Sequence, residues 1–148
     1  MTSRDARTDF WMRVMSRLHR AVVSATGGRI GWRMGPIQVV ELHTIGRSSG
    51  QRRSIMLTAP VVEANRYVVV ASKGGDDRDP FWYNNLVANP EVELTVNGRT
   101  LKATARTATA EERARLWPRA VAVYPGYARY QKKTDREIPV VICDVHPA

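Results

Sequence analysis

The sequence has very little of the chemistry that binds metals or cross-links chains. Its 148 residues include one cysteine, Cys143, and three histidines. An internal disulfide is therefore impossible, no spacing resembles a zinc or iron site, and a reducing cytoplasm is the expected compartment. No apolar run is long enough to cross a bilayer, and no short apolar segment near Met1 is followed by a small-residue cleavage site.

Acidic residues are also scarce, with 14 Asp and Glu against 23 Lys and Arg and a net charge of +9. The imbalance belongs to residues 1–53, which hold ten basic and three acidic side chains, whereas the remainder holds thirteen and eleven. This asymmetry favours an anionic partner. A nucleic acid, an acidic membrane surface and a phosphorylated or polycarboxylate small molecule all fit it.

The length suits a single domain. Residues 1–35 are expected to form an N-terminal amphipathic helix and a linker, and residues 36–148 a closed sheet. The helix is predicted over residues 8–25, with Phe10 and Trp11 on its apolar face and arginines opposite. Two interpretations are open: the helix packs on the core, or it makes peripheral contact with an anionic membrane.

Apolar patterning after residue 36 predicts mostly strands. Six segments stand out: residues 36–44, 54–62, 67–72, 91–96, 99–107 and 138–145. Asn97-Gly98 favours a type I′ hairpin turn, and residues 63–66 offer a second hairpin connection, between residues 54–62 and 67–72. These features predict a mainly β (α+β) fold in which a six-stranded antiparallel sheet closes on itself to hide its edges.

Short helices are expected to cover the ends or one side of this sheet. Asp79 is predicted to cap a helix over residues 80–88. Thr109 and Glu112 form a capping box for a helix that runs towards Tyr124 and that Pro118 either kinks or divides. A further turn or two is expected over residues 125–133.

The segment 44–54 combines two glycines, small hydroxyls and three arginines between two strands. Backbone N–H groups and guanidinium forks of this kind bind phosphate or carboxylate. The glycine spacing is not that of a P-loop. A solvated basic hairpin loop would have the same composition, so both interpretations stay open.

A second candidate segment, residues 71–75, places Ser72 and Lys73 at a strand end before two glycines. By itself it is typical of a glycine turn with a surface lysine. The aromatic residues 81–83 follow closely, and they cannot all face inward on a helix. Together these segments could hold an anionic or carbonyl-rich ligand.

Tyr124, Tyr127 and Tyr130 recur every three residues, so a helical turn would place them on one side. They would either form an aromatic patch or line a flat substrate pocket and donate a proton. No Ser-His-Asp or Cys-His arrangement is recognisable, Cys143 is expected in the core, and His43 is expected to be a half-buried strand residue. An enzyme of this composition would need a cofactor for its chemistry.

Six sequence blocks, in order over most of the chain, resemble the nitroreductase-type, deazaflavin-dependent oxidoreductases (the Ddn-like family), which use coenzyme F-420. Each block alone is weak, whereas six in register are specific. The blocks are T-I-G-R-S-S-G-Q-R-R at residues 44–53, A-S-K-G-G at 71–75, P-F-W-Y-N-N-L-V-A-N-P at 80–90, E-R-A-R-L-W-P at 112–118, Y-P-G-Y-A-R-Y at 124–130 and T-D-R-E-I-P-V-V at 134–141.

The resemblance implies a split β-barrel similar to those that bind flavin mononucleotide (FMN). It implies hydride transfer from reduced deazaflavin to a quinone, with nitroaromatic compounds as further acceptors. The cofactor's phosphate and glutamate tail would explain the basic first third of the chain. Where Arg52 replaces a common proline of the family, phosphate contacts are expected to shift onto Arg52 and Arg53.

The resemblance also assigns site residues. Tyr124, Tyr127, Tyr130 and Ser72 would shape the acceptor site, with Tyr124 as the leading proton donor, and Lys73 would bind acid groups. The residues expected to contact the cofactor are Arg47, Ser48, Ser49, Arg53, Ser54, Ile55, Met56, Leu57, Thr58, Val70, Ala71, Ser72, Lys73, Phe81, Trp82, Tyr83, Asn84, Asn85 and Tyr127.

Two other classes of function remain open. A non-catalytic carrier of deazaflavin or FMN would need no proton donor at the acceptor face. A nucleic-acid module would need aromatic residues interleaved with lysine and arginine on an exposed sheet face, whereas here they cluster at helix starts, so we expect no nucleic-acid partner. A monomer or a homodimer is expected, in the cytoplasm, with a location at the inner face of the membrane left open.

Overall fold

The computed structural model describes residues 32–34 and 37–147. The amphipathic helix predicted over residues 8–25, and the membrane contact suggested for it, lie outside the described residues and stay predictions. In the described part, no helix has the length and apolar character needed to cross a membrane.

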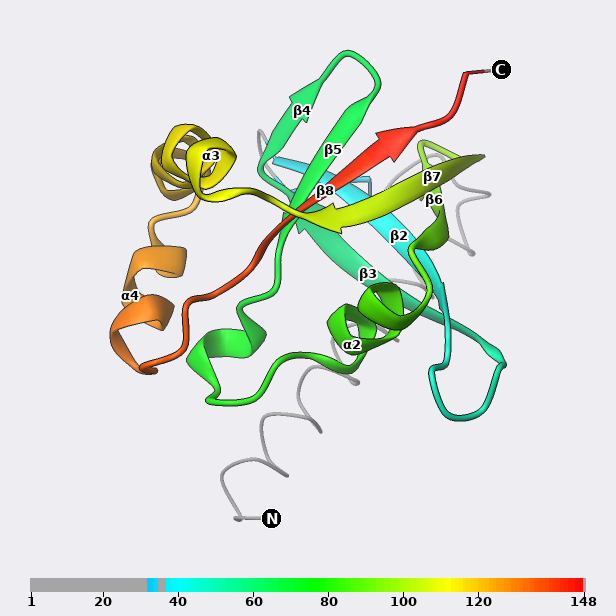
Figure 1. The fold of residues 1–148 in the computed structure, drawn as a ribbon. Coiled ribbons are helices and arrows are strands. Elements are labelled where there is room, and N and C mark those ends of the chain that lie inside the picture. The colour runs from blue at the N-terminus through cyan, green and yellow to red at the C-terminus, as the bar shows by residue number, and fades with distance from the viewer. Residues whose placement is uncertain (1–31, 35–36, 148) are drawn as a thin grey trace.

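An antiparallel sheet of eight strands forms the centre of the described structure (Figure 1). Seven strands follow the order β1-β2-β6-β7-β8-β5-β4, and β3 pairs with β2 outside this path. β3 also lies against β5, so the sheet curls around one core. The strands are β1 (Arg33–Met34), β2 (Ile37–Ile45), β3 (Arg52–Ala59), β4 (Val61–Glu63), β5 (Arg66–Val70), β6 (Glu91–Val96), β7 (Arg99–Thr107) and β8 (Val140–Val145).

The strand predicted over residues 54–62 is in fact two strands. Pro60 separates β3 from β4, and a proline has no N–H with which to continue a ladder. β3 pairs with β2 along its whole length, whereas β4 pairs with β5 across a tight turn between Glu63 and Arg66. The predicted hairpin is therefore correct only for β4. This break and the short β1 make the predicted count of six strands wrong.

The hairpin between β6 and β7 is confirmed with the predicted bounds. Asn97 and Gly98 form its turn with φ angles of 51° and 81°. Glycine and asparagine tolerate this left-handed region better than other residues, which explains why the pair identified the turn in advance.

The helices of the described part are α2 (Phe81–Ala88), α3 (Ala110–Val123) and α4 (Gly126–Lys132), with a single 3-10 turn, η1 (Lys73–Gly75). The capping box at the start of α3 is confirmed, and α3 continues through Pro118. The cap predicted for α2 is wrong: Pro80 is the N-cap, and Asp79 instead accepts a hydrogen bond of 3.0 Å from Arg136. The half-buried guanidinium of Arg136 therefore takes the carboxylate that was expected to cap the helix.

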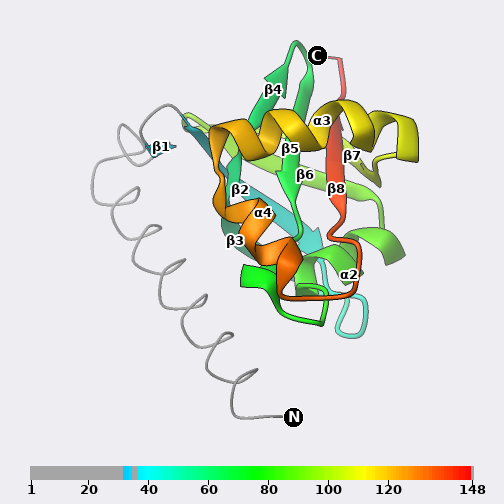
Figure 2. The same cartoon turned by 90° about the vertical axis from the view of Figure 1, so that its left-hand side faces the viewer.

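Apolar contacts attach the helices to the sheet. Trp82 and Leu86 of α2 belong to the largest cluster, between the curled strands. Leu116 of α3 packs on β4, β5 and β8, and Tyr127 of α4 packs on Val70 at the end of β5. Figure 2 shows α3 and α4 on the outside of the curled sheet, in front of its strands. Full burial of a leucine contributes about 2 kcal/mol, so these residues fix the helices firmly in place.

The topology brings two candidate segments to one end of the sheet. Four successive antiparallel pairings connect β2 to β5 through β6, β7 and β8, so β2 and β5 run in the same direction. Their last residues, Ile45 and Val70, therefore lie at the same end, which we call the site end. Figure 1 shows α2 and the connection after β2 together there, with the turn after β5 beside them.

Candidate functional site

The connection between β2 and β3, residues 46–53 with the start of β3, is termed the arginine loop. Most of its backbone donors are already used: the N–H of Gly46 donates to Gln51 over 2.7 Å and that of Gly50 to Gly46 over 2.8 Å. The N–H of Gln51 donates to Ser49 Oγ over 3.2 Å. An anion at this loop would therefore meet guanidinium groups and hydroxyls more than the backbone nest that the glycines suggested.

Asn85 of α2 holds the arginine loop in position. Its Oδ1 accepts the N–H of Arg47 over 3.1 Å, and its Nδ2 donates to Thr44 Oγ1 over the same distance. The side chain is buried, and an unsatisfied buried amide is costly, so both bonds restrict the loop. Asn85, expected to contact the cofactor, acts here as the link between α2 and the arginine loop.

The arginines of this loop differ in their contacts. Arg52 pairs with Glu93 of β6, with 2.8 Å between the guanidinium and the carboxylate. Arg47 and Arg53 are exposed, and within the described ranges no carboxylate pairs with either. The expected shift of phosphate contacts onto Arg52 therefore meets competition from Glu93, whereas Arg47 and Arg53 remain available.

Side chains of β3 alternate between the two faces of the sheet. Ile55 and Leu57 face the largest core cluster, so their side chains are part of the core. On the other face, Met56 packs with Trp32 and Val39, and Ser54 Oγ lies 2.6 Å from His43 Nδ1. Thr58, at the far end of the strand, has its Oγ1 2.9 Å from the hydroxyl of Tyr127 in α4.

The turn after β5, residues 71–79, is termed the lysine turn. Ser72 and Lys73 are each only 9% exposed, and Lys73 has a φ of 45°. A lysine in the left-handed region carries backbone strain, so its surroundings must hold it there. Gly75 has no room for a side chain, because a Cβ would lie 2.8 Å from the backbone oxygen of Tyr130. This close approach packs the lysine turn against α4.

Arg136 fastens the lysine turn. Its guanidinium donates to the backbone oxygens of Ala71, Ser72 and Asp76 over 3.2, 2.9 and 2.8 Å. With the bond to Asp79, these contacts satisfy most of its donors. Arg136 belongs to the sequence block at 134–141, for which no role of this residue was predicted. Its partners lie some 60 residues earlier, so no local pattern could identify them.

The aromatic residues at the start of α2 point in different directions, as predicted. Phe81 is 49% exposed, whereas Trp82 is 1% exposed and lies in the core. The hydroxyl of Tyr83 lies 2.8 Å from Thr107 Oγ1 on β7. Asn84 is half-buried beside these residues. Phe81 is therefore the aromatic side chain of α2 most accessible to a ligand.

The tyrosine cluster, Tyr124, Tyr127 and Tyr130, is confirmed as one group. Tyr124 is the C-cap of α3, and its ring lies 4.9 Å from that of Tyr127, nearly perpendicular to it. The hydroxyls of Tyr124 and Tyr130 are 2.9 Å apart. The bond from Thr58 to Tyr127 joins this cluster to β3, the strand that continues the arginine loop.

The surroundings of Tyr127 and Tyr130 raise the pKa of both phenols. Burial raises the pKa of Tyr127, although its hydrogen bond with Thr58 acts in the opposite direction. The hydrogen bond with Tyr124, assisted by burial, raises the pKa of Tyr130 to about 12. Near neutral pH both hydroxyls therefore remain hydrogen-bond donors.

Similarity to known proteins covers most of the chain. Residues 14–145 match the family model described as F420H(2)-dependent quinone reductase. The chain belongs to this family. An F420H(2)-dependent quinone reductase of Mycobacterium tuberculosis is 42% identical over 130 residues, which cover 85% of this chain and 87% of that protein. The resemblance inferred from the six sequence blocks is thus confirmed.

Two solved structures are also similar. An F420-H2 dependent reductase (FDR-A) is 46% identical, with a TM-score of 0.65, and the match covers 72% of this chain and 93% of that one. A structure described as a domain-swapped dimer is 40% identical, with a TM-score of 0.69, and the match covers 86% and 96% of the two chains. The fold of this chain is therefore similar to the folds of these two solved structures.

The remaining sequence candidates have structural roles in this member of the family. Cys143 is fully buried, as expected, and burial raises the pKa of its thiol to about 12. His43 is more buried than expected, with its ring nitrogens 2.6 Å from Ser54 Oγ and 2.7 Å from Thr95 Oγ1. In residues 32–34 and 37–147, no cluster of His, Cys, Asp and Glu could hold a metal ion.

Proposed function

We propose that this protein is a reductase that transfers a hydride from reduced coenzyme F-420 to a quinone. Family membership supports the reaction type and the cofactor. One geometric observation carries the assignment to this site: the 2.9 Å hydrogen bond between Thr58 and Tyr127. It joins the strand expected to contact the cofactor to the tyrosines expected to contact the quinone.

The donor set at the site end fits an anionic deazaflavin. The coenzyme carries a phosphate and a glutamate tail, and Arg47 and Arg53 have no carboxylate partner among the described residues. Guanidinium groups bind phosphate and carboxylate through paired N–H donors. Arg47, Arg53 and the hydroxyls of Ser48 and Ser49 would hold the charged groups, and the lysine turn and Phe81 would border the ring.

When bound and reduced, the deazaflavin supplies the two electrons and one hydrogen as a hydride. A quinone that gains a hydride needs one further proton, from the chain or from water, to become a hydroquinone. Tyr124 would donate this proton from its hydroxyl to a quinone oxygen. Tyr130, 2.9 Å away, would orient that hydroxyl, and Tyr127 would hold the ring of Tyr124 in place.

Replacing Tyr124 by Phe tests this role. Loss of a general acid slows a step by roughly 100-fold or more, so quinone turnover should fall by that order while the Kd for F-420 changes less than about twofold. Deazaflavin absorbance and tryptophan quenching measure the two quantities. Tyr67→Phe, on β5 outside the cluster, is the matched control. Unchanged turnover in Tyr124→Phe would remove the proposed proton donor.

Several finer features belong to the same proposal. The curled sheet supports a split β-barrel, and the relative described as a domain-swapped dimer supports a homodimer, which light scattering would test. The family description names F420H(2), so FMN and a non-catalytic carrier have no comparable support. Nitroaromatic acceptors, a cytoplasmic location and membrane contact through residues 8–25 remain expectations from sequence.

A further inference from the structure

Gly126 occupies a position where the backbone does not require glycine. It is the first residue of α4, in a helical conformation that any residue adopts. The position has no space for a side chain: a Cβ at residue 126 would lie 2.6 Å from both Cε1 and Cζ of Tyr124 and 2.8 Å from the hydroxyl oxygen. The ring of Tyr124 therefore occupies the volume that a side chain at position 126 would fill.

The ring of Tyr124 is held from three sides. Gly126 lies against its tip, Tyr127 meets it edge to face at 4.9 Å between centroids, and its hydroxyl is 2.9 Å from that of Tyr130. A methyl group at Gly126 would push the ring tip away by about 1 Å, since ordinary contacts begin at 3.4 Å. The hydroxyl is at this tip, so the hydrogen bond to Tyr130 would be lost or lengthened.

We propose that Gly126 is a positioning residue that fixes the ring of Tyr124, and through it the rate of quinone reduction. The inference rests on the proposed function, in which the Tyr124 hydroxyl donates the proton. Gly126 touches neither the quinone nor the cofactor in this account. Its contribution is the absence of a side chain, which lets the tyrosine tip lie over the first turn of α4.

The central variant is Gly126→Ala in the full-length protein, followed first without any ligand. The five tyrosines can all be replaced by 3-fluorotyrosine, and single Tyr→Phe variants assign their ¹⁹F NMR signals. We expect the signals of Tyr124 and Tyr130 to move in Gly126→Ala while that of Tyr67 stays. Unmoved Tyr124 and Tyr130 signals overturn the inference, whatever the activity.

Kinetics give the second readout. A displacement near 1 Å lowers rates by up to about 100-fold, so kcat with a water-soluble quinone should fall by roughly tenfold to 100-fold. The Kd for F-420, measured by tryptophan quenching, should stay within about twofold, because the arginine loop is untouched. A cofactor Kd that rises as much as kcat falls would show general disruption of the site and would overturn the inference.

A double variant separates this inference from the proposed function. In the Tyr124→Ala background the ring is gone, so Gly126→Ala should change kcat less than about twofold and should restore folding if the single variant folds poorly. If Gly126→Ala lowers kcat in that background as much as it does in the parent protein, the positioning role is wrong. If Gly126→Ala shifts the signals but leaves kcat unchanged, the kinetic part of the inference is wrong. Tyr124→Phe then decides whether the proposed function has failed too.

Discussion

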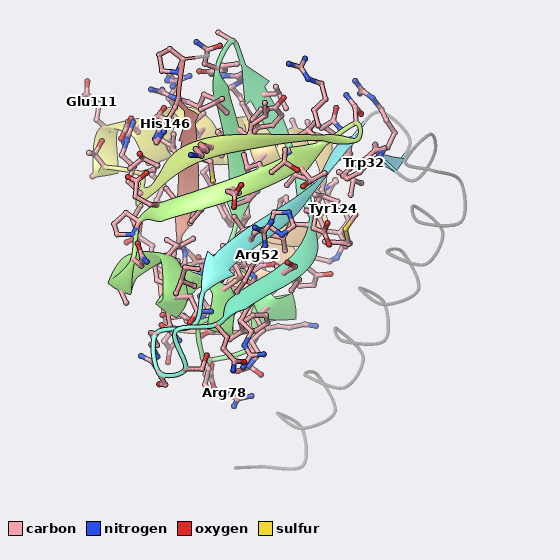
Figure 3. All side chains as sticks on the ribbon, turned by 90° about the vertical axis from the view of Figure 1, so that its right-hand side faces the viewer. Trp32, Arg52, Arg78, Glu111, Tyr124 and His146 are labelled. Carbon is pink, nitrogen blue, oxygen red and sulfur yellow. The ribbon has the colours of Figure 1, made fainter. Side chains whose placement is uncertain are left out.

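The arginines near α3 and the arginines of the loop after β2 differ in what they contact. Arg106 binds Glu112 over 2.7 Å and Asp144 over 3.1 Å, and Arg115 and Arg119 both bind Glu63. Arg47 and Arg53 have no such partner within the described ranges. In Figure 3, Glu111 at the start of α3 lies well apart from Arg78 of the lysine turn, whose guanidinium pairs with Asp76 over 3.4 Å.

This difference shows why the number of arginines alone says little about function. Partly exposed ion pairs contribute about 0 to 1 kcal/mol each, so the pairs near α3 mainly neutralise one another. Unneutralised arginines keep a positive potential that attracts an anion. The net charge of +9 is thus not spread evenly, and the site end has guanidinium groups to offer a phosphate or carboxylate.

The largest effect is expected at Arg136, whose guanidinium holds the backbone of the lysine turn in place. Arg136→Lys cannot reproduce the bonds to three backbone oxygens, so unfolding free energy should fall by about 2 to 3 kcal/mol, and the Kd for F-420 should rise at least about tenfold. Urea unfolding and fluorescence titration measure these. Arg66→Lys, which alters the half-exposed pair with Asp144, should cost less than about 1 kcal/mol. Equal losses in the two variants would contradict the special role of the lysine turn.

A pair of matched double variants tests the comparison itself. Arg47→Gln with Arg53→Gln should raise the Kd for F-420 by about tenfold to 100-fold, because each lost guanidinium removes a charge-assisted contact of about 1 kcal/mol or more. Arg115→Gln with Arg119→Gln removes the same charge but should change the Kd by less than about threefold. If both pairs weaken binding equally, long-range net charge and not local contact attracts the cofactor.

The smallest effect concerns pH near α3. The hydrogen bonds from Arg106, with help from the N–H of Thr109, lower the pKa of Glu112 from 4.5 to about 2. The folded state therefore gains stability from the ionised carboxylate above pH 4.5 and loses it as the pH falls towards 2. Solvent screening limits this to about 1 kcal/mol. Thermal unfolding of Glu112→Gln and the parent should differ most at pH 7, and the difference should shrink below pH 4.5 and vanish only as the pH reaches about 2; a constant difference would be inconsistent with this assignment.

The features predicted correctly from sequence depend on neighbours along the chain. Asn97-Gly98 fixes its own turn, and Thr109 and Glu112 cap a helix three residues apart, so short patterns were sufficient. The break at Pro60 was missed because residues 54–62 remain mostly apolar on both sides of the proline while the pairing partner changes. Local periodicity does not say which strand lies alongside.

The residue types of the candidate site could be predicted from the sequence, but the side chains that hold its loops in position could not. The spacing of the tyrosines predicted their grouping, which the ring contacts confirm. The roles of Asn85 and Arg136 depend on partners about 40 and 60 residues away, which only the fold brings close. Likewise, the pairing of Arg52 with Glu93 depends on β3 and β6 lying on either side of β2.

The most direct test follows amide signals of ¹⁵N-labelled protein by NMR during titration with oxidised F-420. The account predicts that perturbations concentrate in the arginine loop, the lysine turn and α4, with little change at β4 and the middle of α3. Perturbations centred on Glu63, Arg115 and Arg119, with none in the arginine loop, would contradict a cofactor site at the end of the sheet where β2 and β5 terminate.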